Sequence, residues 1–383
     1  MSEPVFPAGL PVRIEGASAW YGPAMAARED WIETLSPGEL DELAHACTPW
    51  LSEHADWSEL SRERFVLPTL APRLARLQRE LLEGRGFVLV RSLPLAAWGR
   101  RCSALAFYGL GTHLGRPLSQ NAQGHLLGHV RDQGLSSADP NVRIYQTRER
   151  QTFHTDSADV VGLLCLQPAR RGGASALVSS ITLYNELRAR RPELAACLFE
   201  PLATDRRGEV PPGARPFFEI PVFNWFAGRL STIYQRQYIK SAQRFPDAPR
   251  LSARQVEALD LLDALTDDPA LHFTMQFESG DMQFVHNHTL LHDRTAYEDW
   301  PEPARKRHLL RLWLAPATAR PLPPVFAQRY GNVVPGYRGG VPSADGRLVA
   351  GLDLDESLAV ADYSTSVASL RTPVRISASD SDA

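Results

Sequence analysis

Side chains that bind divalent metals gather in two short segments of the sequence. The first is the triplet His154-Thr155-Asp156, and the second holds His286, His288 and His292. In an extended strand, residues i and i+2 point to the same side, so the histidine and the aspartate of the triplet can aim at one point. Two imidazoles and one carboxylate form a facial ligand set that holds Fe(II) and leaves the opposite face open for oxygen chemistry. The residues therefore predict a mononuclear metal site.

Several alternatives are compatible with these residues. Spacing alone does not select one of the three downstream histidines as the third ligand, and a His-x-Asp triplet can also form a simple hydrogen bond. The same donor set can hold Zn(II) with a bound water, as in a zinc hydrolase. That reaction needs a general base beside the water, and we can assign none. A non-catalytic barrel protein is the remaining alternative.

Two arginines share one face of a predicted strand at residues 306–315. The alternation places Arg307, Leu309, Arg311 and Trp313 on one side of that strand. Both faces are largely apolar, which predicts a strand buried on both sides, and arginines on a buried face need anionic partners. The guanidinium fork suits a carboxylate, which is either a ligand or a structural Asp or Glu. Ser175, just after the turn at Gly172-Gly173, could donate to the same carboxylate, although a serine there is usually only a turn residue.

The elements that must position these residues are helices first and strands later. Ser36 to Glu39 forms a capping box, and apolar residues at helical spacing follow it. Further helices are predicted at Pro72–Glu83, Ala96–Leu114, Thr182–Arg190 and after Ser252, and strands at Phe87–Val90, Val160–Leu166, Ala174–Ser179, Arg215–Tyr234, His272–Glu278, Met282–His286 and Lys306–Ala315. Helices outside and strands inside predict an α+β protein with a mainly β core that forms a closed or nearly closed barrel.

Composition restricts the classes of partner. The 383 residues are 44% hydrophobic and 22% charged, with a formal net charge of −3. No basic surplus indicates nucleic acid or an anionic membrane as a partner, and no apolar run reaches the roughly 18 residues of a transmembrane helix. The four widely spaced cysteines and the absence of a visible signal peptide favour a reducing, cytoplasmic location. A small-molecule substrate is expected, and a homo-oligomer is compatible with the sequence.

Taken in this order, the motifs resemble those of a known family. They are Phe153-His154-Thr155-Asp156, Gly172-Gly173-Ala174-Ser175, Asn287 to Arg294, and Arg307 to Arg311. They span about 160 residues and resemble the taurine dioxygenase/TfdA family of Fe(II)- and 2-oxoglutarate-dependent dioxygenases, to which the gamma-butyrobetaine hydroxylase and clavaminate synthase groups are related. The resemblance implies a double-stranded β-helix, or jelly roll, with flanking helices. We expect a helical N-terminal region at 1–85, the oxygenase domain at 86–376, and a disordered tail at 377–383.

The resemblance also implies a metal site and a cosubstrate site. It assigns His154, Asp156 and His292 to the iron as catalytic residues, and it favours His292 because that histidine directly precedes Asp293-Arg294. It assigns Arg307, assisted by Ser175, to 2-oxoglutarate. Dioxygen completes the reactants. A carboxylate at position 156 argues against halogenation, because family halogenases replace it by a small residue that leaves room for chloride.

The substrate is the least determined part of the prediction. Arg311 matches the position that holds an acidic substrate group in the taurine enzyme, and Tyr145 and Gln123 are further candidate substrate contacts. The implied reaction is hydroxylation of an unactivated C–H bond in a small acidic, amino-acid-like or natural-product substrate, with release of succinate and CO2. Desaturation, epoxidation and ring formation use the same cofactor and remain alternatives. Arg150 stands where the taurine enzyme has an asparagine, so taurine itself is not carried over.

Overall fold

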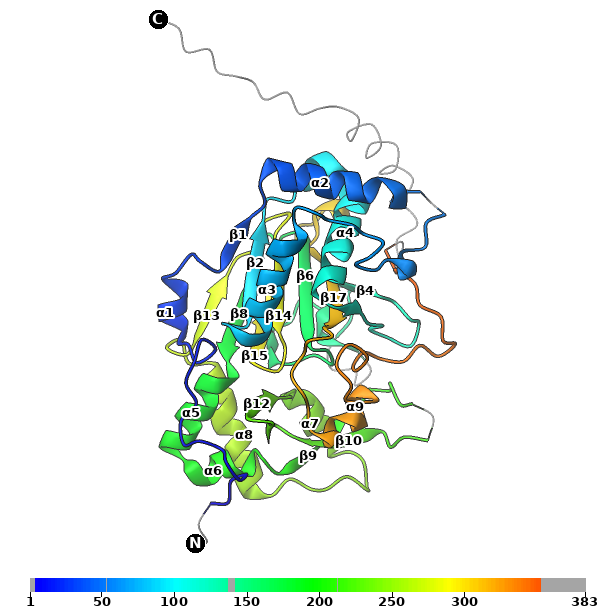
Figure 1. The fold of residues 1–383 in the computed structure, drawn as a ribbon. Coiled ribbons are helices and arrows are strands. Elements are labelled where there is room, and N and C mark those ends of the chain that lie inside the picture. The colour runs from blue at the N-terminus through cyan, green and yellow to red at the C-terminus, as the bar shows by residue number, and fades with distance from the viewer. Residues whose placement is uncertain (1–3, 53, 137–141, 212, 353–383) are drawn as a thin grey trace, which may run out of the picture.

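A computed structural model describes residues 4–52, 54–136, 142–211 and 213–352, and its largest element is a seven-stranded sheet (Figure 1). The strand order is β1-β2-β14-β6-β17-β3, and β4 also pairs with β17. The bounds are β1 Ile32–Thr34, β2 Phe87–Arg91, β3 Arg116–Pro117, β4 Leu127–Val130, β6 Val160–Gln167, β14 Met282–His286 and β17 His308–Ala315. The pairs are antiparallel, except that β1 and β2 are parallel. The predicted strands at 87–90, 160–166, 282–286 and 306–315 all lie in this sheet.

A four-stranded antiparallel sheet packs against the large one. Its order is β13-β8-β15-β5, with bounds β13 His272–Met275, β8 Ser175–Ser179, β15 Leu290–Arg294 and β5 Gln151–His154. Apolar side chains of the two sheets meet in one cluster, in which Phe87 of the large sheet contacts Phe273 of the small sheet at a ring-centroid distance of 5.4 Å. The chain therefore has a two-layer β core, and the candidate histidine ligands His154 and His292 lie on the small sheet.

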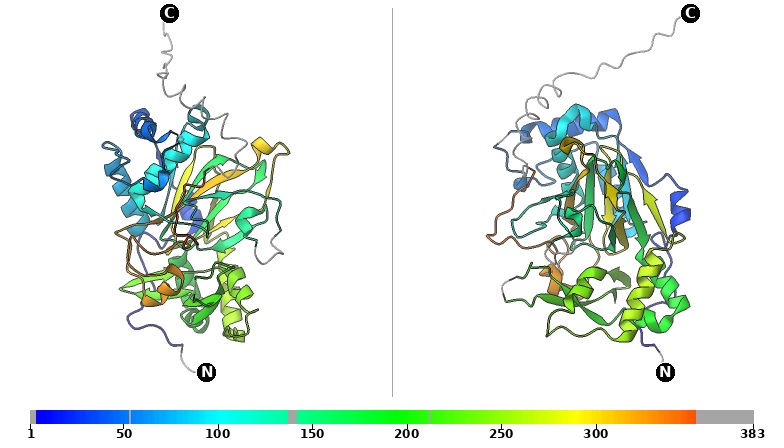
Figure 2. Two further views of the ribbon diagram at one scale, coloured as in Figure 1. Left: turned by 90° about the vertical axis from the view of Figure 1, so that its right-hand side faces the viewer. Right: turned by 180° about the vertical axis from the view of Figure 1, so that it is seen from behind.

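Three helices cover the outer face of the large sheet: α2 (Pro37–Cys47), α3 (Ala71–Glu83) and α4 (Leu95–Leu114) (Figures 1 and 2). The predicted capping box at Ser36 is present, and α3 buries Leu74, Leu77 and Leu81. On β17, the alternate residues Leu310, Leu312 and Leu314 join the same core. The expected alternation is confirmed, because one face of β17 packs under the helices while Leu309 and Arg311 on the other face line a cavity. Arg307, directly before the strand, lines the same cavity.

A second group of elements lies at one end of the sheets, in the lower part of Figure 1. It contains α5 (Ser180–Arg190), α6 (Pro192–Cys197), α7 (Arg236–Ala242), α8 (Ala253–Thr266), α9 (Ala327–Tyr330), and the hairpins β9 (Pro201–Asp205) with β10 (Phe217–Pro221) and β11 (Phe223–Phe226) with β12 (Arg229–Thr232). The helix predicted at Thr182–Arg190 is α5, and Pro192 begins the next helix, α6, where its missing N–H costs nothing. The segment predicted as strand-like at 215–234 is three strands.

The remaining described elements are short: α1 (Gly22–Ala26), the pair β7 (Arg171–Gly172) and β16 (Tyr297–Glu298), and 3-10 turns at Thr48–Trp50, Trp57–Glu59, Ile144–Gln146, Pro303–Arg305 and Pro324–Phe326. Residues from 35 to 82 share one hydrophobic core with the large sheet. Within the described ranges, no helix has both the length and the apolar character needed to cross a membrane. The tail predicted to be disordered, 377–383, lies outside the described residues.

Candidate metal centre

Three predicted ligands converge at the open edge of the small sheet. His154 ends β5 and is the cross-strand partner of His292 on β15, and Asp156 follows two residues after the strand. The Nε2 atoms of the two histidines lie 3.9 Å and 4.0 Å from the Asp156 carboxylate oxygens. One ligand atom from each side chain lies within 4.8 Å of the others, and no other group of three such side chains converges in this way among the described residues. The donor set therefore has the shape of a metal site.

The two imidazoles are prepared to act as neutral ligands. Nδ1 of His154 donates to the Thr152 carbonyl at 2.9 Å, which leaves Nε2 as the nitrogen with a lone pair; the Gln151 amide donates to it at 2.8 Å. Burial lowers the pKa of both histidines, and His154 lowers that of His292 further, to about 3. Because metals bind the deprotonated form, these imidazoles fit a cation without first losing a proton.

The carboxylate of Asp156 is held ionised. Oδ2 accepts from the Trp313 indole at 2.9 Å and from Arg311 Nη1 at 3.2 Å. Burial alone would raise the pKa of Asp156, but the charge of Arg311, the two imidazoles when they are protonated, and the indole N–H outweigh it and hold the pKa below its ordinary range. An anionic carboxylate beside two neutral imidazoles is the donor chemistry that suits Fe(II).

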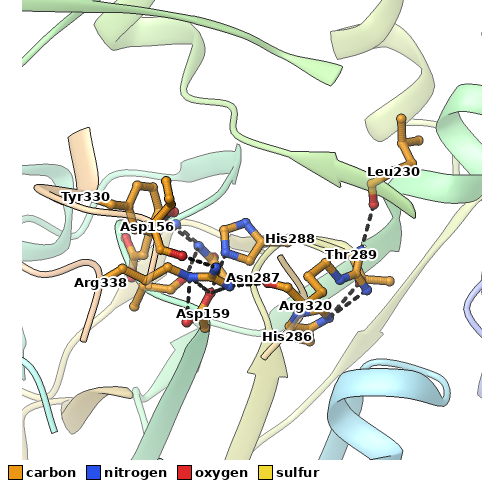
Figure 3. Close-up of polar contacts among 12 residues, drawn as sticks. Asp156, Asp159, Leu230, His286, Asn287, His288, Thr289, Arg320, Tyr330 and Arg338 are labelled. Carbon is orange, nitrogen blue, oxygen red and sulfur yellow. Dashed lines mark hydrogen bonds and ion pairs between the residues drawn. The ribbon is translucent and has the colours of Figure 1, made fainter. Parts of the chain in front are cut away.

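Asp156 reaches the histidines by a turn and not by strand alternation. β5 ends at His154, and the N–H of Thr155 bonds to the carbonyl of Tyr234, outside the sheet. The Asn287 amide then holds the Asp156 backbone from both sides, because its oxygen accepts from the Asp156 N–H at 2.9 Å and its nitrogen donates to the Asp156 carbonyl (Figure 3). The predicted convergence of the two side chains is confirmed, but the predicted reason for it is wrong.

The other two histidines of the downstream segment have different partners (Figure 3). His288 is fully buried and its Nε2 bonds to Asp159 at 2.8 Å. His286 is also buried, and its Nδ1 accepts from the Thr289 hydroxyl at 2.7 Å. Among the three candidates, only His292 points to the His154–Asp156 pair. Its position on β15 therefore resolves the choice that the spacing left open.

A cavity of about 480 Å³ adjoins the converging side chains, and three buried arginines line it: Arg294, Arg307 and Arg311. Arg311 contacts Asp156, whereas the other two keep unpaired N–H groups. Nη1 of Arg307 and both Nε and Nη1 of Arg294 are buried without a hydrogen-bond partner among the described residues. The two guanidiniums lie 5.0 Å and 4.9 Å from the Tyr297 ring centroid. Burial and the charge of Arg307 lower the pKa of Arg294 to about 10. Buried guanidiniums with free N–H groups in a cavity call for an anion.

Ser175 lines this same cavity, so the structure brings it to Arg307 as predicted. Its hydroxyl lies 3.3 Å from Oε1 of Gln283, to which it donates. Sequence reasoning did not assign a role to Arg294, although a signal was available. Arg294 stands two residues after His292 on the same strand, and alternation puts both on one face.

A second cavity of about 740 Å³ also adjoins Asp156. Arg311 and Tyr145 line both cavities, and the Arg311 guanidinium lies 4.8 Å from the Tyr145 ring centroid. Gln123 is exposed and lines neither cavity, so the structure does not bring this predicted contact to the site. Gln120, three residues earlier, does contact the site, because its Oε1 accepts from Nε of Arg311 at 2.8 Å.

Comparison with known proteins places this chain among iron oxygenases. Residues 51–313 match the family model described as taurine catabolism dioxygenase TauD, TfdA family. The chain is 30% identical over 319 residues to FR-33289 synthase of Streptomyces rubellomurinus, covering 81% of this chain and 92% of that protein. It is 32% identical over 181 residues to a uridine-5'-phosphate dioxygenase of Amycolatopsis sp, covering 45% and 64%. Among solved structures, asparagine oxygenase with Fe(II), 3-hydroxyasparagine and succinate aligns with a TM-score of 0.57 at 17% identity, covering 74% of this chain and 93% of that one.

Proposed function

Because the chain belongs to the taurine catabolism dioxygenase TauD, TfdA family, we propose that this non-haem iron, 2-oxoglutarate-dependent dioxygenase binds its iron through His154, Asp156 and His292. The observation that carries the proposal is the convergence of these three ligand atoms within 4.8 Å. When bound, iron with 2-oxoglutarate and dioxygen supplies the oxidising chemistry, in which the keto acid becomes succinate and CO2. The protein supplies ligand geometry, charge and exclusion of water. In this proposal the two packed sheets are the halves of a double-stranded β-helix.

The 480 Å³ cavity is the proposed 2-oxoglutarate site. Arg307 binds the carboxylate far from the metal, and the Ser175 hydroxyl turns from Gln283 to donate to it. Arg294 adds a second positive charge next to the same Tyr297 ring. The unpaired N–H groups of both arginines support this assignment, because a dicarboxylate would supply the acceptors that the protein lacks.

The 740 Å³ cavity is the proposed substrate site, and hydroxylation of a C–H bond in a small acidic molecule is the proposed reaction. Arg311 and Tyr145 line both cavities and so stand between cosubstrate and substrate. Arg311 also orients the Asp156 carboxylate through its 3.2 Å contact. Two relatives support the proposal: a solved structure holds a hydroxylated amino acid with succinate, and one protein is named for uridine-5'-phosphate, an anion.

An anaerobic titration tests the metal and cosubstrate sites. Fe(II) and 2-oxoglutarate added to the full chain should produce the visible charge-transfer band of the iron-bound keto acid. His154→Ala and Asp156→Ala should each lose the band, while the exposed His45→Ala should keep it. A band of wild-type intensity in Asp156→Ala would remove that carboxylate from the site.

A second measurement tests the reaction. With dioxygen admitted, small acids that increase succinate release should gain the mass of one oxygen atom. Loss of two hydrogens without oxygen gain would instead indicate desaturation or ring formation, and it would overturn the assignment as a hydroxylase while leaving the cofactor sites intact.

A further inference from the structure

One wall of the 740 Å³ cavity carries positive charge that has no role in holding the metal ligands. Arg143, Arg206 and Arg329 line it, from the loop before the 3-10 turn at Ile144, from the end of β9 and from α9. None of them belongs to the converging metal ligands or to the cavity with Arg307. The metal site and the Arg307 cavity therefore do not explain why these three guanidiniums are present.

The carboxylates in this region do not balance these arginines. Glu209 pairs with both Arg143 and Arg329, at 3.4 Å for the latter. Asp205, which lines this wall, is engaged by Arg244 at 3.1 Å and by the Ser241 hydroxyl at 2.5 Å. One carboxylate thus serves two guanidiniums, and the third has none. The wall keeps a surplus of about two positive charges, which is costly in a buried cavity unless an anion binds there.

Arg206 is the residue left without an acidic partner. It is 6% exposed, its Nε donates to the Arg215 carbonyl at 3.0 Å, and its Nη2 donates to the Gln328 carbonyl. Burial, with the nearby charge of Arg329 and Arg215, lowers the pKa of Arg206 to about 10. Two carbonyls fix the direction of this guanidinium but neutralise none of its charge.

The geometry of Arg329 brings this wall close to the metal ligands. Its Nε donates to the Ser157 hydroxyl at 2.8 Å, and Ser157 directly follows Asp156. The guanidiniums of Arg206 and Arg329 lie 5.5 Å and 6.0 Å from the centroid of the same ring, Phe218. An anion held between them would place the rest of a small molecule beside the Asp156 turn.

We propose that Arg206 and Arg329, assisted by Arg143, form a subsite for a tetrahedral oxyanion, and that the substrate is a small molecule carrying a phosphate or phosphonate group. A dianion matches the surplus charge, and three acceptor oxygens can be reached by guanidiniums that approach from three different elements, whereas a carboxylate offers a single plane. The inference rests on the proposed function, because it assigns the anion to the molecule that is oxidised beside Asp156.

Binding of simple anions to the full chain tests the subsite. Inorganic phosphate, methyl phosphate and methylphosphonate are titrated calorimetrically into the protein at about pH 8, where these probes carry close to two charges, and acetate serves as the planar probe. We expect saturable binding of the tetrahedral probes and an affinity for acetate lower by about tenfold or more. The methyl phosphate and methylphosphonate arms separate the two sources of the group. Equal affinity for acetate, or no saturable binding, would overturn the proposal.

Substitutions locate the binding. Arg206→Gln should weaken methylphosphonate binding by about tenfold, the loss expected for one charge-assisted contact. Arg206→Lys keeps the charge and should lose less, which guards against a folding defect in the glutamine variant. Arg190→Gln, whose residue forms a surface ion pair with Glu186 on α5, is the matched control and should bind as wild type does. Unchanged binding in Arg206→Gln would overturn the proposal.

Two further arms separate this proposal from the proposed function. Arg307→Ala should keep methylphosphonate binding, which excludes the 2-oxoglutarate cavity as the place where the probe binds; a loss there would overturn the subsite. Arg206→Gln should keep the visible band of the iron-bound keto acid. If the wild type gave no band, the proposed metal chemistry would fail while the methylphosphonate titration still decided the subsite.

Discussion

Arg307 is a buried charge whose missing hydrogen-bond acceptor can be assigned to a bound ligand. Its backbone N–H bonds to Asp299 at 2.6 Å, but its Nη1 has no acceptor among the described residues. Arg307→Ala should therefore raise the dissociation constant for 2-oxoglutarate by about a hundredfold, ~3 kcal/mol, the cost of truncating one partner of a buried charge pair. Anaerobic titration of the iron-loaded protein measures this constant.

The control for that substitution is Arg305→Ala, two residues earlier. Arg305 is exposed and its ion pair with Glu302, at 3.8 Å, is long. Its loss should leave 2-oxoglutarate binding unchanged, since exposed ion pairs contribute little. Equal constants in wild type and Arg307→Ala would contradict the assignment of the cosubstrate cavity.

The choice between neighbouring histidines gives a second prediction at this scale. His288→Ala should retain iron, because His288 bonds to Asp159, whose charge Arg338 still meets at 2.7 Å; it should lower the free energy of unfolding by about 1–3 kcal/mol for the lost buried hydrogen bond. His292→Ala should lose iron. Metal content after dialysis and urea denaturation measure the two effects. Iron retained in His292→Ala and lost in His288→Ala would reverse the assignment.

How far the site could be predicted follows from which contacts are local. The His-x-Asp triplet and the alternation on β17 are short patterns, and the structure brings together the side chains that they indicated, His154 with Asp156 and Arg307 with Arg311. The choice of His292 came from the resemblance and not from a local pattern. The Asn287 clamp on Asp156 spans 131 residues, and no local pattern contains it. For the same reason, the sequence could not show that Arg311 contacts Asp156 or that Gln123 lies apart from both cavities.

At the scale of elements, helix α4 depends on glycines for its close approach to its neighbours. A Cβ added at Gly109 would lie 2.3 Å from the Phe65 ring, which is fully buried. Gly109→Ala should therefore destabilise the protein by about 1–3 kcal/mol through overpacking, although alanine has the higher helix propensity. Chemical denaturation of the full chain measures the difference.

Gly38 in α2 provides the matched control, because a Cβ there meets nothing within 4 Å. Gly38→Ala should be neutral or stabilise by about 0.5 kcal/mol, since only the propensity term remains. Changes of opposite sign in the free energy of unfolding for the two substitutions would show that packing outweighs helix propensity in α4. Destabilisation of the same size in both would contradict this reading. The glycines were visible in the sequence, but the approach of Phe65 was not.

At the scale of the whole molecule, the chain after β17 returns to the core and fastens the turn that carries Asp156. Arg338 is fully buried and bonds to Asp159 at 2.7 Å, and Nη2 of Arg320 donates to the Thr289 hydroxyl at 2.8 Å (Figure 3). The Arg338–Asp159 contact joins residues 179 apart in sequence. The sequence predicted none of this, because a buried arginine in an irregular segment has no periodicity. The strands of the β core are local patterns and could be predicted, but their pairing order and the contacts that fasten the Asp156 turn could not.

This buried network should make global stability depend on pH. Burial, with positive charge from Arg320, Arg338, Arg229 and, when it is protonated, His288, holds the pKa of His286 well below its ordinary value. In the unfolded chain this histidine takes up a proton near pH 6.5, whereas the folded protein leaves it neutral. Below about pH 6.5 the unfolded state thus binds the additional proton, and the free energy of unfolding falls as pH falls, by up to about 1.4 kcal/mol per pH unit for each such histidine.

Urea denaturation between about pH 7.5 and pH 5.5 tests this dependence, over a range in which buried histidines dominate the titration. His286→Gln should lower the free energy of unfolding at the higher pH, because the Thr289 contact is altered. It should also reduce the loss of stability on acidification by up to about 1.4 kcal/mol per pH unit, the contribution of one proton. His154 and His292 keep their contributions in both proteins, so the difference between the two slopes isolates His286. The exposed His45→Gln should leave the slope unchanged. An equal slope in wild type and His286→Gln would mean that His286 is protonated in the folded protein, against the charges that surround it.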